Sequence, residues 1–226
     1  VAIITGASKG IGREIALAFA RAGADLLLSS RGQESLQSTA EEVAELGVRV
    51  EIQAGDVGSE ADVNAMFEHW ESSFDKLDLL VNNAGAFNGG PLDELATEDW
   101  DHVINTNLRG PFLCTRAAMK IMKGQGGGRI INIGSISAQR VRFNSAPYST
   151  SKHGLWGLTQ VTALEGREHG ITCGCLHPGN ILTERRDASD AIADQEPMIG
   201  VDDISEVALL MASLPPHVEM LESIVL

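Results

Sequence analysis

Short apolar runs rich in β-branched residues alternate along the chain with longer segments in which apolar residues recur every three or four positions. The first pattern is typical of buried strands and the second of amphipathic helices. The predicted strands are 1–4, 25–29, 48–53, 77–81, 129–133, 171–176 and 221–226, and the predicted helices are 13–20, 34–46, 61–74, 97–122, 147–168 and 203–214. Such alternation predicts an α/β fold with a parallel sheet of about seven strands, covered by helices on both faces.

Two features qualify this pattern. The helix over 97–122 is expected to be interrupted near Gly110 and Pro111, and residues 183–201 form the one long irregular stretch. Irregular segments of that length in compact domains are commonly functional. The sequence shows no internal repeat and no second domain, so residues 1–226 are expected to form a single domain.

The composition is that of an ordinary globular protein with an acidic surface. The chain has 226 residues, 43% of them hydrophobic and 21% charged, and a formal net charge of −14. This charge disfavours binding to nucleic acids and to anionic membranes, so neither is expected as a partner. The apolar runs are too short to cross a bilayer, and the chain opens on a strand with no signal-peptide pattern, so a cytoplasmic location is expected.

Cysteine and histidine give no sign of a metal site. Cys114, Cys173 and Cys175 do not form an even disulfide framework, and the six histidines are scattered without metal-ligand spacing. We therefore expect buried, reduced thiols and no bound metal.

A glycine-rich turn lies between the first predicted strand and the first helix. Gly6, Gly10 and Gly12 give the spacing G-x-x-x-G-x-G. Glycines allow a tight turn and a close approach of the backbone to a pyrophosphate, which the N–H groups at the start of the helix can then bind. A strand, a glycine turn and a helix in this order indicate a dinucleotide site.

A second group of residues indicates acid–base chemistry. Tyr148 and Lys152 are four residues apart on a predicted helix, and therefore share one face. A nearby ammonium group favours the ionised form of a phenol, which makes the tyrosine a usable general acid or base. Ser135 lies thirteen residues before Tyr148, just after a predicted strand.

These motifs, with three others in the same order, resemble the short-chain dehydrogenase/reductase family in its short, single-domain branch, which includes the 3-oxoacyl-carrier-protein reductases. The matching segments are 5–12, 82–85, Asn107, Ser135, Tyr148 with Lys152, and Pro178-Gly179. The resemblance implies a doubly wound (Rossmann) domain and hydride transfer between a nicotinamide cofactor and a carbonyl or alcohol substrate. It also implies that the irregular stretch over 183–201 is a substrate lid.

The resemblance assigns roles to individual residues. It implies that Tyr148 is the proton donor, that Ser135 donates to the same substrate oxygen, that Lys152 supports Tyr148 and holds the nicotinamide ribose, and that Asn107 holds a water beside Lys152. Ser137 is a weaker alternative to Ser135, because its spacing to Tyr148 is two residues shorter. The implied cofactor-binding residues are Gly6, Ser8, Lys9, Gly10, Ile11, Gly12, Ser30, Arg31, Asp56, Val57, Asn83, Ala84, Gly85, Tyr148, Lys152, Pro178, Gly179 and Ile181. The resemblance also implies that Asn82 orders the backbone next to them.

The residues after the second strand decide between the two nicotinamide cofactors. Enzymes that prefer NAD place an acidic residue there to hold the ribose hydroxyls, whereas this chain has Ser30 and Arg31. An arginine can bind the 2′-phosphate of NADP, and Lys9 in the glycine turn adds a second cation. NADP(H) is therefore the predicted cofactor. Asp25 does not favour NAD, because it is predicted at the opposite end of the strand.

The substrate and the assembly are less closely defined. Segments 87–90, 139–144 and 183–201 are expected to line the substrate pocket, with Arg140, Arg142, Arg185 and Arg186 near enough to meet an acidic group. A 3-oxoacyl thioester, a simple ketone and a polyol all remain open. An idle NADP-binding regulator and an NAD-dependent alcohol dehydrogenase of the same fold are the alternatives.

The family resemblance also implies a homotetramer, with a dimer as the second choice. Its expected contact is between the helices over 97–122 and 147–168. The residues assigned to this contact are Gly154, Leu155, Gly157, Leu158 and Val161.

Overall fold

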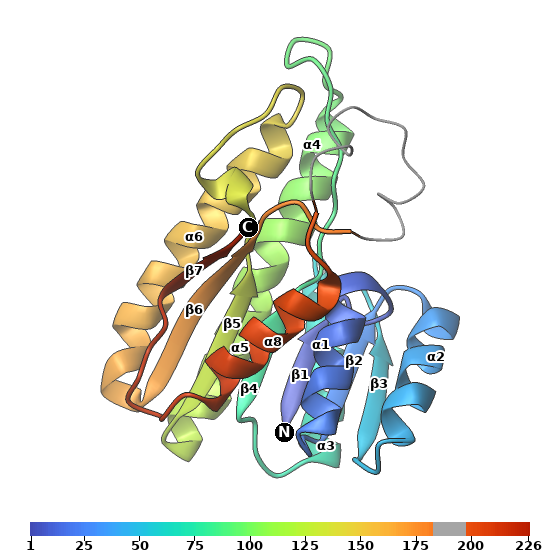
Figure 1. The fold of residues 1–226 in the computed structure, drawn as a ribbon, viewed down its shortest axis with the longest axis vertical. Helices are drawn as coiled ribbons and strands as arrows, with labels where there is room; N and C mark the ends of the chain where they lie inside the picture. Colours follow the sequence, from blue (N-terminus) through green and yellow to red (C-terminus); the bar gives the residue numbers. More distant parts are fainter. Residues whose placement is uncertain (183–197) are drawn as a thin grey trace.

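The computed structural model describes residues 1–182 and 198–226. Their parallel sheet has the strand order β3-β2-β1-β4-β5-β6-β7, as Figure 1 shows. The strands are β1 Ala2–Thr5, β2 Leu26–Ser30, β3 Val50–Ala54, β4 Leu79–Asn82, β5 Gly128–Ile133, β6 Ile171–Pro178 and β7 Glu222–Val225. The strand order reverses between β1 and β4. Open α/β sheets bind their ligands in the crevice at such a reversal, at the carboxyl ends of the strands. The predicted single doubly wound sheet is confirmed.

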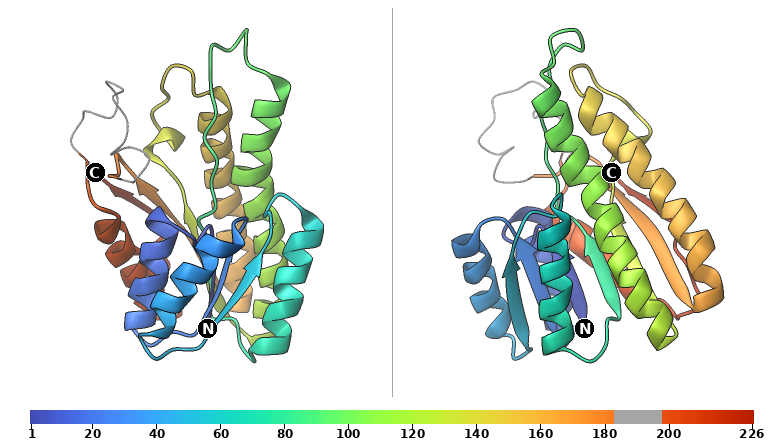
Figure 2. Two further views of the ribbon diagram at one scale, coloured as in Figure 1. Left: turned by 90° about the vertical axis from the view of Figure 1, so that its right-hand side faces the viewer. Right: turned by 180° about the vertical axis from the view of Figure 1, so that it is seen from behind.

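Helices cover both faces of the sheet (Figures 1 and 2). On one face lie α1 Gly10–Arg21, α2 Gln33–Ala44 and α8 Val201–Ser213; on the other lie α3 Glu60–Ser73, α4 Thr97–Ile104, α5 Gly110–Gln125 and α6 Ala146–Gly166. Between α4 and α5 the helix passes through a π-helical turn, η1 Asn105–Arg109, and the two short 3₁₀ turns are η2 Ile136–Ala138 and η3 Arg167–His169.

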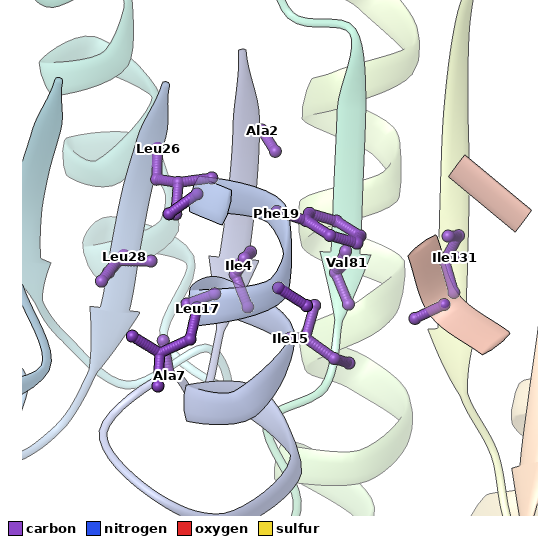
Figure 3. Close-up of a cluster of buried hydrophobic side chains, with 14 of the residues drawn as sticks. Ala2, Ile4, Ala7, Ile15, Leu17, Phe19, Leu26, Leu28, Val81 and Ile131 are labelled. Carbon is purple, nitrogen blue, oxygen red and sulfur yellow. The ribbon is translucent and has the colours of Figure 1, made fainter. Parts of the chain in front are cut away.

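Side chains alternate between two cores along β1. Ile4 packs with Ile15 and Phe19 of α1 on one face, as Figure 3 shows, whereas Ile3 belongs to the core beneath α3 and α5. Ile3 and Ile4 are both 0% exposed. A strand covered on both faces needs apolar residues at consecutive positions, which explains why this run showed no polar alternation.

Local chemistry sets several boundaries. The Ser59 side chain accepts a hydrogen bond from the Asp62 N–H, which caps α3. Pro111 and Pro147 occupy the first turns of α5 and α6, where their missing N–H groups cost nothing. The interruption expected near Gly110 and Pro111 is η1, which covers the five residues before Gly110.

The three cysteines are buried and free. Burial raises the pKa of the Cys114 and Cys175 thiols to about 12, and it raises the pKa of Cys173 well above its usual value. Cys173 and Cys175 are two residues apart on β6 and so face the same side of the sheet. The expectation of buried, reduced thiols is confirmed.

Candidate active site

The glycine turn between β1 and α1 is tied to the start of the loop that follows β4. Gly6 and Gly10 have φ of 66° and 56°, the left-handed region that favours glycine. A Cβ on Gly6 would lie 2.7 Å from the Ala84 Cα, so only glycine fits there. A Cβ on Gly10 would meet nothing within 4 Å, which leaves open space beside the start of α1. This open, amide-lined turn fits a pyrophosphate.

Asn83 and Thr5 make the connection between β1 and β4. The Asn83 Nδ2 donates to the Thr5 carbonyl at 3.0 Å and to the Gly6 carbonyl at 3.1 Å. The Thr5 hydroxyl accepts from the Asn83 and Ala84 N–H groups, each at 3.1 Å, and donates to the Val81 carbonyl at 3.3 Å. Thr5 thus orders both sides of the crevice, a role that the sequence analysis did not assign.

Asn82, which the resemblance implies as a backbone-ordering residue, does not reach this turn. Its side chain is 3% exposed and points into the core, where its Nδ2 donates to the Thr115 hydroxyl and to the Asn132 amide oxygen. A strand residue and its neighbour face opposite sides, so only one of two consecutive asparagines can reach the glycine turn.

The residues predicted to discriminate between the cofactors, Ser30 and Arg31, lie at the carboxyl end of β2. The Ala7 N–H donates to the Ser29 carbonyl at 3.1 Å, which brings the glycine turn beside the end of this strand. Lys9 and Arg31 are both exposed there, and the Ser30 hydroxyl donates to the Gly32 carbonyl at 3.4 Å. Asp25 lies at the other end of β2, where it accepts from the Arg49 N–H at 2.8 Å.

The next predicted cofactor residues lie at the same edge of the sheet. Asp56 follows β3, and its Oδ1 accepts from the Gly58 N–H at 2.8 Å, while the buried Val57 packs against Gly110. On the far side of the crevice, the Gly179 N–H donates to the Val225 carbonyl at 2.8 Å. Ile181 pairs with Ile199. Of the remaining positions, Ser8 lies in the turn, Ile11 and Gly12 in the first turn of α1, Ala84 and Gly85 in the loop after β4, and Pro178 at the end of β6.

Tyr148 and Lys152 lie on one face of the first turns of α6. Lys152 is 5% exposed, and its Nζ donates to the Ile133 carbonyl at 2.8 Å and lies 5.6 Å from the centre of the Tyr148 ring. The Phe87 ring from the loop after β4 meets the Tyr148 ring edge-on, with centroids 5.1 Å apart. Lys152 therefore joins the end of β5 to the tyrosine.

Ser135 begins the turn that follows β5. It is 8% exposed, and its Oγ accepts from the Ser137 N–H at 3.1 Å. Its backbone contacts the buried imidazole of His177, which the sequence analysis did not assign. Ser137 thus supports Ser135 through its backbone.

Asn107 is buried in the π-helical turn η1. Its Oδ1 accepts from the Ala86 N–H at 2.7 Å, and its Nδ2 donates to the Ala86 carbonyl at 2.9 Å and to the Ser151 hydroxyl at 3.2 Å. The turn widens the helix at this asparagine, as π-bulges commonly do at functional sites. Asn107 anchors the loop after β4 to α6, the helix of Tyr148 and Lys152.

Part of the predicted pocket lies outside the described residues. Thr183, Arg185, Arg186 and most of the expected lid, 183–197, belong to that part. Of the other two arginines, Arg140 is exposed, and the Arg142 guanidinium donates to the Asn180 amide oxygen at 2.9 Å. Among residues 1–182 and 198–226, no cluster of three potential metal ligands is found, and none of their helices is long and apolar enough to cross a membrane.

Comparison with known proteins places this site in a family. A sequence model described as short chain dehydrogenase matches residues 1–193. The chain is 40% identical to the (2S)-[(R)-hydroxy(phenyl)methyl]succinyl-CoA dehydrogenase subunit BbsD of Thauera aromatica, over 81% of this chain and 73% of that protein. It is 35% identical to the D-beta-hydroxybutyrate dehydrogenase of Cupriavidus necator, over 80% and 70% of the two chains.

Solved structures of similar proteins match this chain over nearly its full length. A single-residue variant of the actinorhodin polyketide ketoreductase, solved with NADPH, has a TM-score of 0.91 and 32% identity, over 99% of this chain and 94% of that chain. The acetoin dehydrogenase YohF from Salmonella typhimurium has a TM-score of 0.87 and 29% identity, over 100% and 93%. The chain belongs to the short-chain dehydrogenase family and is an NAD(P)-dependent oxidoreductase.

Proposed function

We propose that this enzyme reduces a carbonyl group, or oxidises the corresponding alcohol, with NADP(H), and that Tyr148 transfers the proton. The observation that carries this proposal is the position of Lys152. Its ammonium group lies beside the Tyr148 ring and is bonded to Ile133, two residues before Ser135. Lys152 thus links Tyr148 on α6 to the end of β5, which Ser135 follows, and all three side chains suit an oxygen that gains charge.

In the reductive direction, Tyr148 gives its proton to the substrate oxygen, and the Ser135 hydroxyl donates a hydrogen bond to the same oxygen. Bound NADPH supplies the hydride. Lys152 provides positive charge beside the phenol, and Asn107 holds the loop that carries Phe87 against α6.

The cofactor preference follows from the residues after β2. Neither Ser30 nor Arg31 carries a negative charge that would repel a 2′-phosphate, and Lys9 lies in the adjacent turn. The NADPH in the ketoreductase structure is consistent with this choice. The glycine turn holds the pyrophosphate, and Asp56 and Val57 contact the adenine.

The substrate is proposed to be a ketone or a 3-oxoacyl thioester. The names of the relatives describe oxidation of hydroxy compounds or reduction of a keto group, which fits a secondary alcohol and ketone pair. Phe87 is 54% exposed beside Tyr148, and Val141 and Phe143 are also exposed, which favours a substrate with an apolar portion.

The test is loss of NADPH absorbance with a panel of simple ketones, 3-oxoesters and 3-oxoacyl thioesters, repeated with NADH and, in reverse, with polyols. We expect turnover of at least one carbonyl class and faster turnover with NADPH. Tight NADPH binding without turnover of any carbonyl or alcohol would instead identify an idle cofactor-binding protein.

We also propose a homotetramer, with a dimer as the second choice. Val161 and Leu164 on α6 and Phe112 on α5 are 51%, 65% and 45% exposed, an apolar surface on two adjacent helices. Leu155 was wrongly assigned to this contact, because it is 1% exposed, and Gly154 packs against Leu108 within the chain. Light scattering of wild type and Val161→Lys at micromolar concentration tests the assembly; a wild-type monomer contradicts it.

A further inference from the structure

A histidine outside the predicted catalytic group lies directly behind Ser135. His177, near the end of β6, is 0% exposed. Its Nδ1 lies 3.3 Å from the Ser135 nitrogen and 2.9 Å from the Ser135 carbonyl oxygen. A Cβ on Gly134 would lie 2.5 Å from this Nδ1, so the glycine leaves the space that the imidazole occupies.

The other ring nitrogen faces β7. The His177 Nε2 is buried without a hydrogen-bond partner among the described residues, but it lies 3.5 Å from the Glu222 Oε1. That carboxylate also accepts from the Gln139 Nε2 at 2.6 Å. Gln139 follows the short turn that begins at Ser135. The Ser135 backbone, His177, Glu222 and Gln139 therefore form one connected group that joins β5, β6 and β7.

The ring is held in its neutral form. Burial lowers the pKa of His177, and this effect outweighs the opposing influences of the Ser135 backbone and Glu222. The charged groups that face the imidazole are Glu222 and Lys152. A neutral imidazole carries one proton. On Nδ1 this proton is donated to the Ser135 carbonyl at 2.9 Å; on Nε2 it faces Glu222 and leaves Nδ1 to accept from the Ser135 N–H at 3.3 Å. In either form the ring bonds the Ser135 backbone.

We propose that His177 is a positioning residue that acts through Ser135, and that Glu222 and Gln139 hold its ring. This inference rests on the proposed role of Ser135 as a donor to the substrate oxygen. The Ser135 hydroxyl can meet that oxygen only if its backbone is fixed, and a displacement of about 1 Å can cost roughly 100-fold in rate. The imidazole supplies this restraint from the side of the serine that the substrate does not reach.

The test compares His177→Leu with His177→Asn, each in the wild-type and in the Ser135→Ala background. Leucine fills the space without polar atoms, whereas asparagine carries a donor and an acceptor near the Nδ1 position. We expect His177→Leu to lower kcat about tenfold to 100-fold without raising the KM for NADPH. His177→Asn should recover most of this loss. In the Ser135→Ala background His177→Leu should have no further effect, because the group it positions is gone.

His153→Leu is the matched control. His153 lies on α6 and also bonds a backbone carbonyl, that of Ser149 at 2.8 Å, but it is exposed and outside the proposed site. The kcat of His153→Leu should equal that of wild type.

Three results would overturn the inference while leaving the proposed function in place. They are full kcat in His177→Leu, an equal loss of kcat in both backgrounds, and the same loss in His177→Asn as in His177→Leu, each alongside a Ser135→Ala protein whose kcat is strongly lowered but measurable. Full activity in Ser135→Ala would overturn the proposed role of Ser135 and the inference together.

If His177→Leu does not fold, Glu222→Gln provides the same comparison. It keeps an acceptor for Gln139 but removes the charge that faces the imidazole. A loss of kcat seen only with Ser135 present supports the proposal, and an equal loss in both backgrounds or no loss overturns it.

Discussion

The two halves of the sheet organise their carboxyl edges in different ways. Around β1 and β4 the crevice is shaped by backbone: left-handed glycines, carbonyl oxygens and N–H groups joined through the short side chains of Thr5 and Asn83. Around β5, β6 and β7 the edge is shaped by buried ionisable side chains, Lys152 against Ile133 and His177 between Ser135 and Glu222.

This difference suggests a division of labour. A backbone cradle recognises the phosphates that both nicotinamide cofactors share, and it needs few side chains to do so. Buried ionisable groups are costly to desolvate, but they can place charge and a proton at one atom. Substitutions in the first half should therefore change cofactor affinity, and substitutions in the second half should change turnover.

The largest effect is expected for Tyr148→Phe. The change removes only the hydroxyl, so kcat should fall by about two or more orders of magnitude, the contribution of a general acid. NADPH affinity, measured by fluorescence titration, should stay nearly unchanged. Near-wild-type turnover in Tyr148→Phe would contradict the proposed mechanism. It would also contradict the assignment of proton transfer to the second half of the sheet.

The next effect tests cofactor selection in the first half. A charge-assisted hydrogen bond contributes about 1.5–3 kcal/mol, so Arg31→Ala should weaken NADPH binding roughly tenfold to 100-fold and leave NADH nearly untouched. Ser30→Asp should shift the preference further, because it adds repulsion against the phosphate. The measurement is kcat/KM with each cofactor. Equal losses with both cofactors in Arg31→Ala, or a wild-type preference for NADH, would show that the NADP assignment is wrong.

Glycine substitutions test how the cradle is built. Gly6→Ala combines a left-handed backbone with a collision against Ala84, and should lower the free energy of unfolding by at least about 1–3 kcal/mol. Gly10→Ala has the same backbone conformation without a collision, so it should destabilise less while still weakening cofactor binding. Gly90→Ala, which meets open space at ordinary φ, is the control. Chemical denaturation compares all three, and equal losses would show that the collision is unimportant.

The smallest effect is a pH dependence in the second half. The folded pKa of His177 lies below its unfolded value of about 6.5, so the folded state binds fewer protons in that window. The stability that the neutral ring provides is present above about pH 6.5, and it is lost as pH falls through the lower folded pKa. Thermal melts of wild type should lose stability over this range by more than melts of His177→Asn. Parallel curves for the two proteins would contradict the assignment.

The sequence analysis was most successful where the signal is local. The glycine turn and the alternation of strands and helices depend on periodicity and neighbouring residues. The errors fell where distant residues decide. Asn82 ends β4 and bonds to β5 and α5, whereas the next residue, Asn83, reaches the glycine turn; only those distant partners distinguish the two. Leu155 was taken for a surface residue because the neighbours that bury it come from other elements.

His177 and the irregular turn η1 illustrate the same limit. The partners of His177 are 42 and 45 positions away, at Ser135 and Glu222, so no spacing rule could connect them. In the π-helical turn, Asn107 bonds to Ala86, a partner that only the folded loop brings close. Gly110 and Pro111 suggested an interruption nearby, but not its form.

The three buried cysteines can report how often the folded structure opens. Cys114, Cys173 and Cys175 are 0% exposed, and their thiols stay protonated at neutral pH, so a thiol reagent can modify them only when the sheet or the helices over it separate. The labelling rate therefore measures how often that opening occurs. A cofactor that binds only the closed form should slow labelling by the factor one plus its concentration over its Kd. Comparing NADPH with NADH in this way would rank the two cofactors without any knowledge of the substrate.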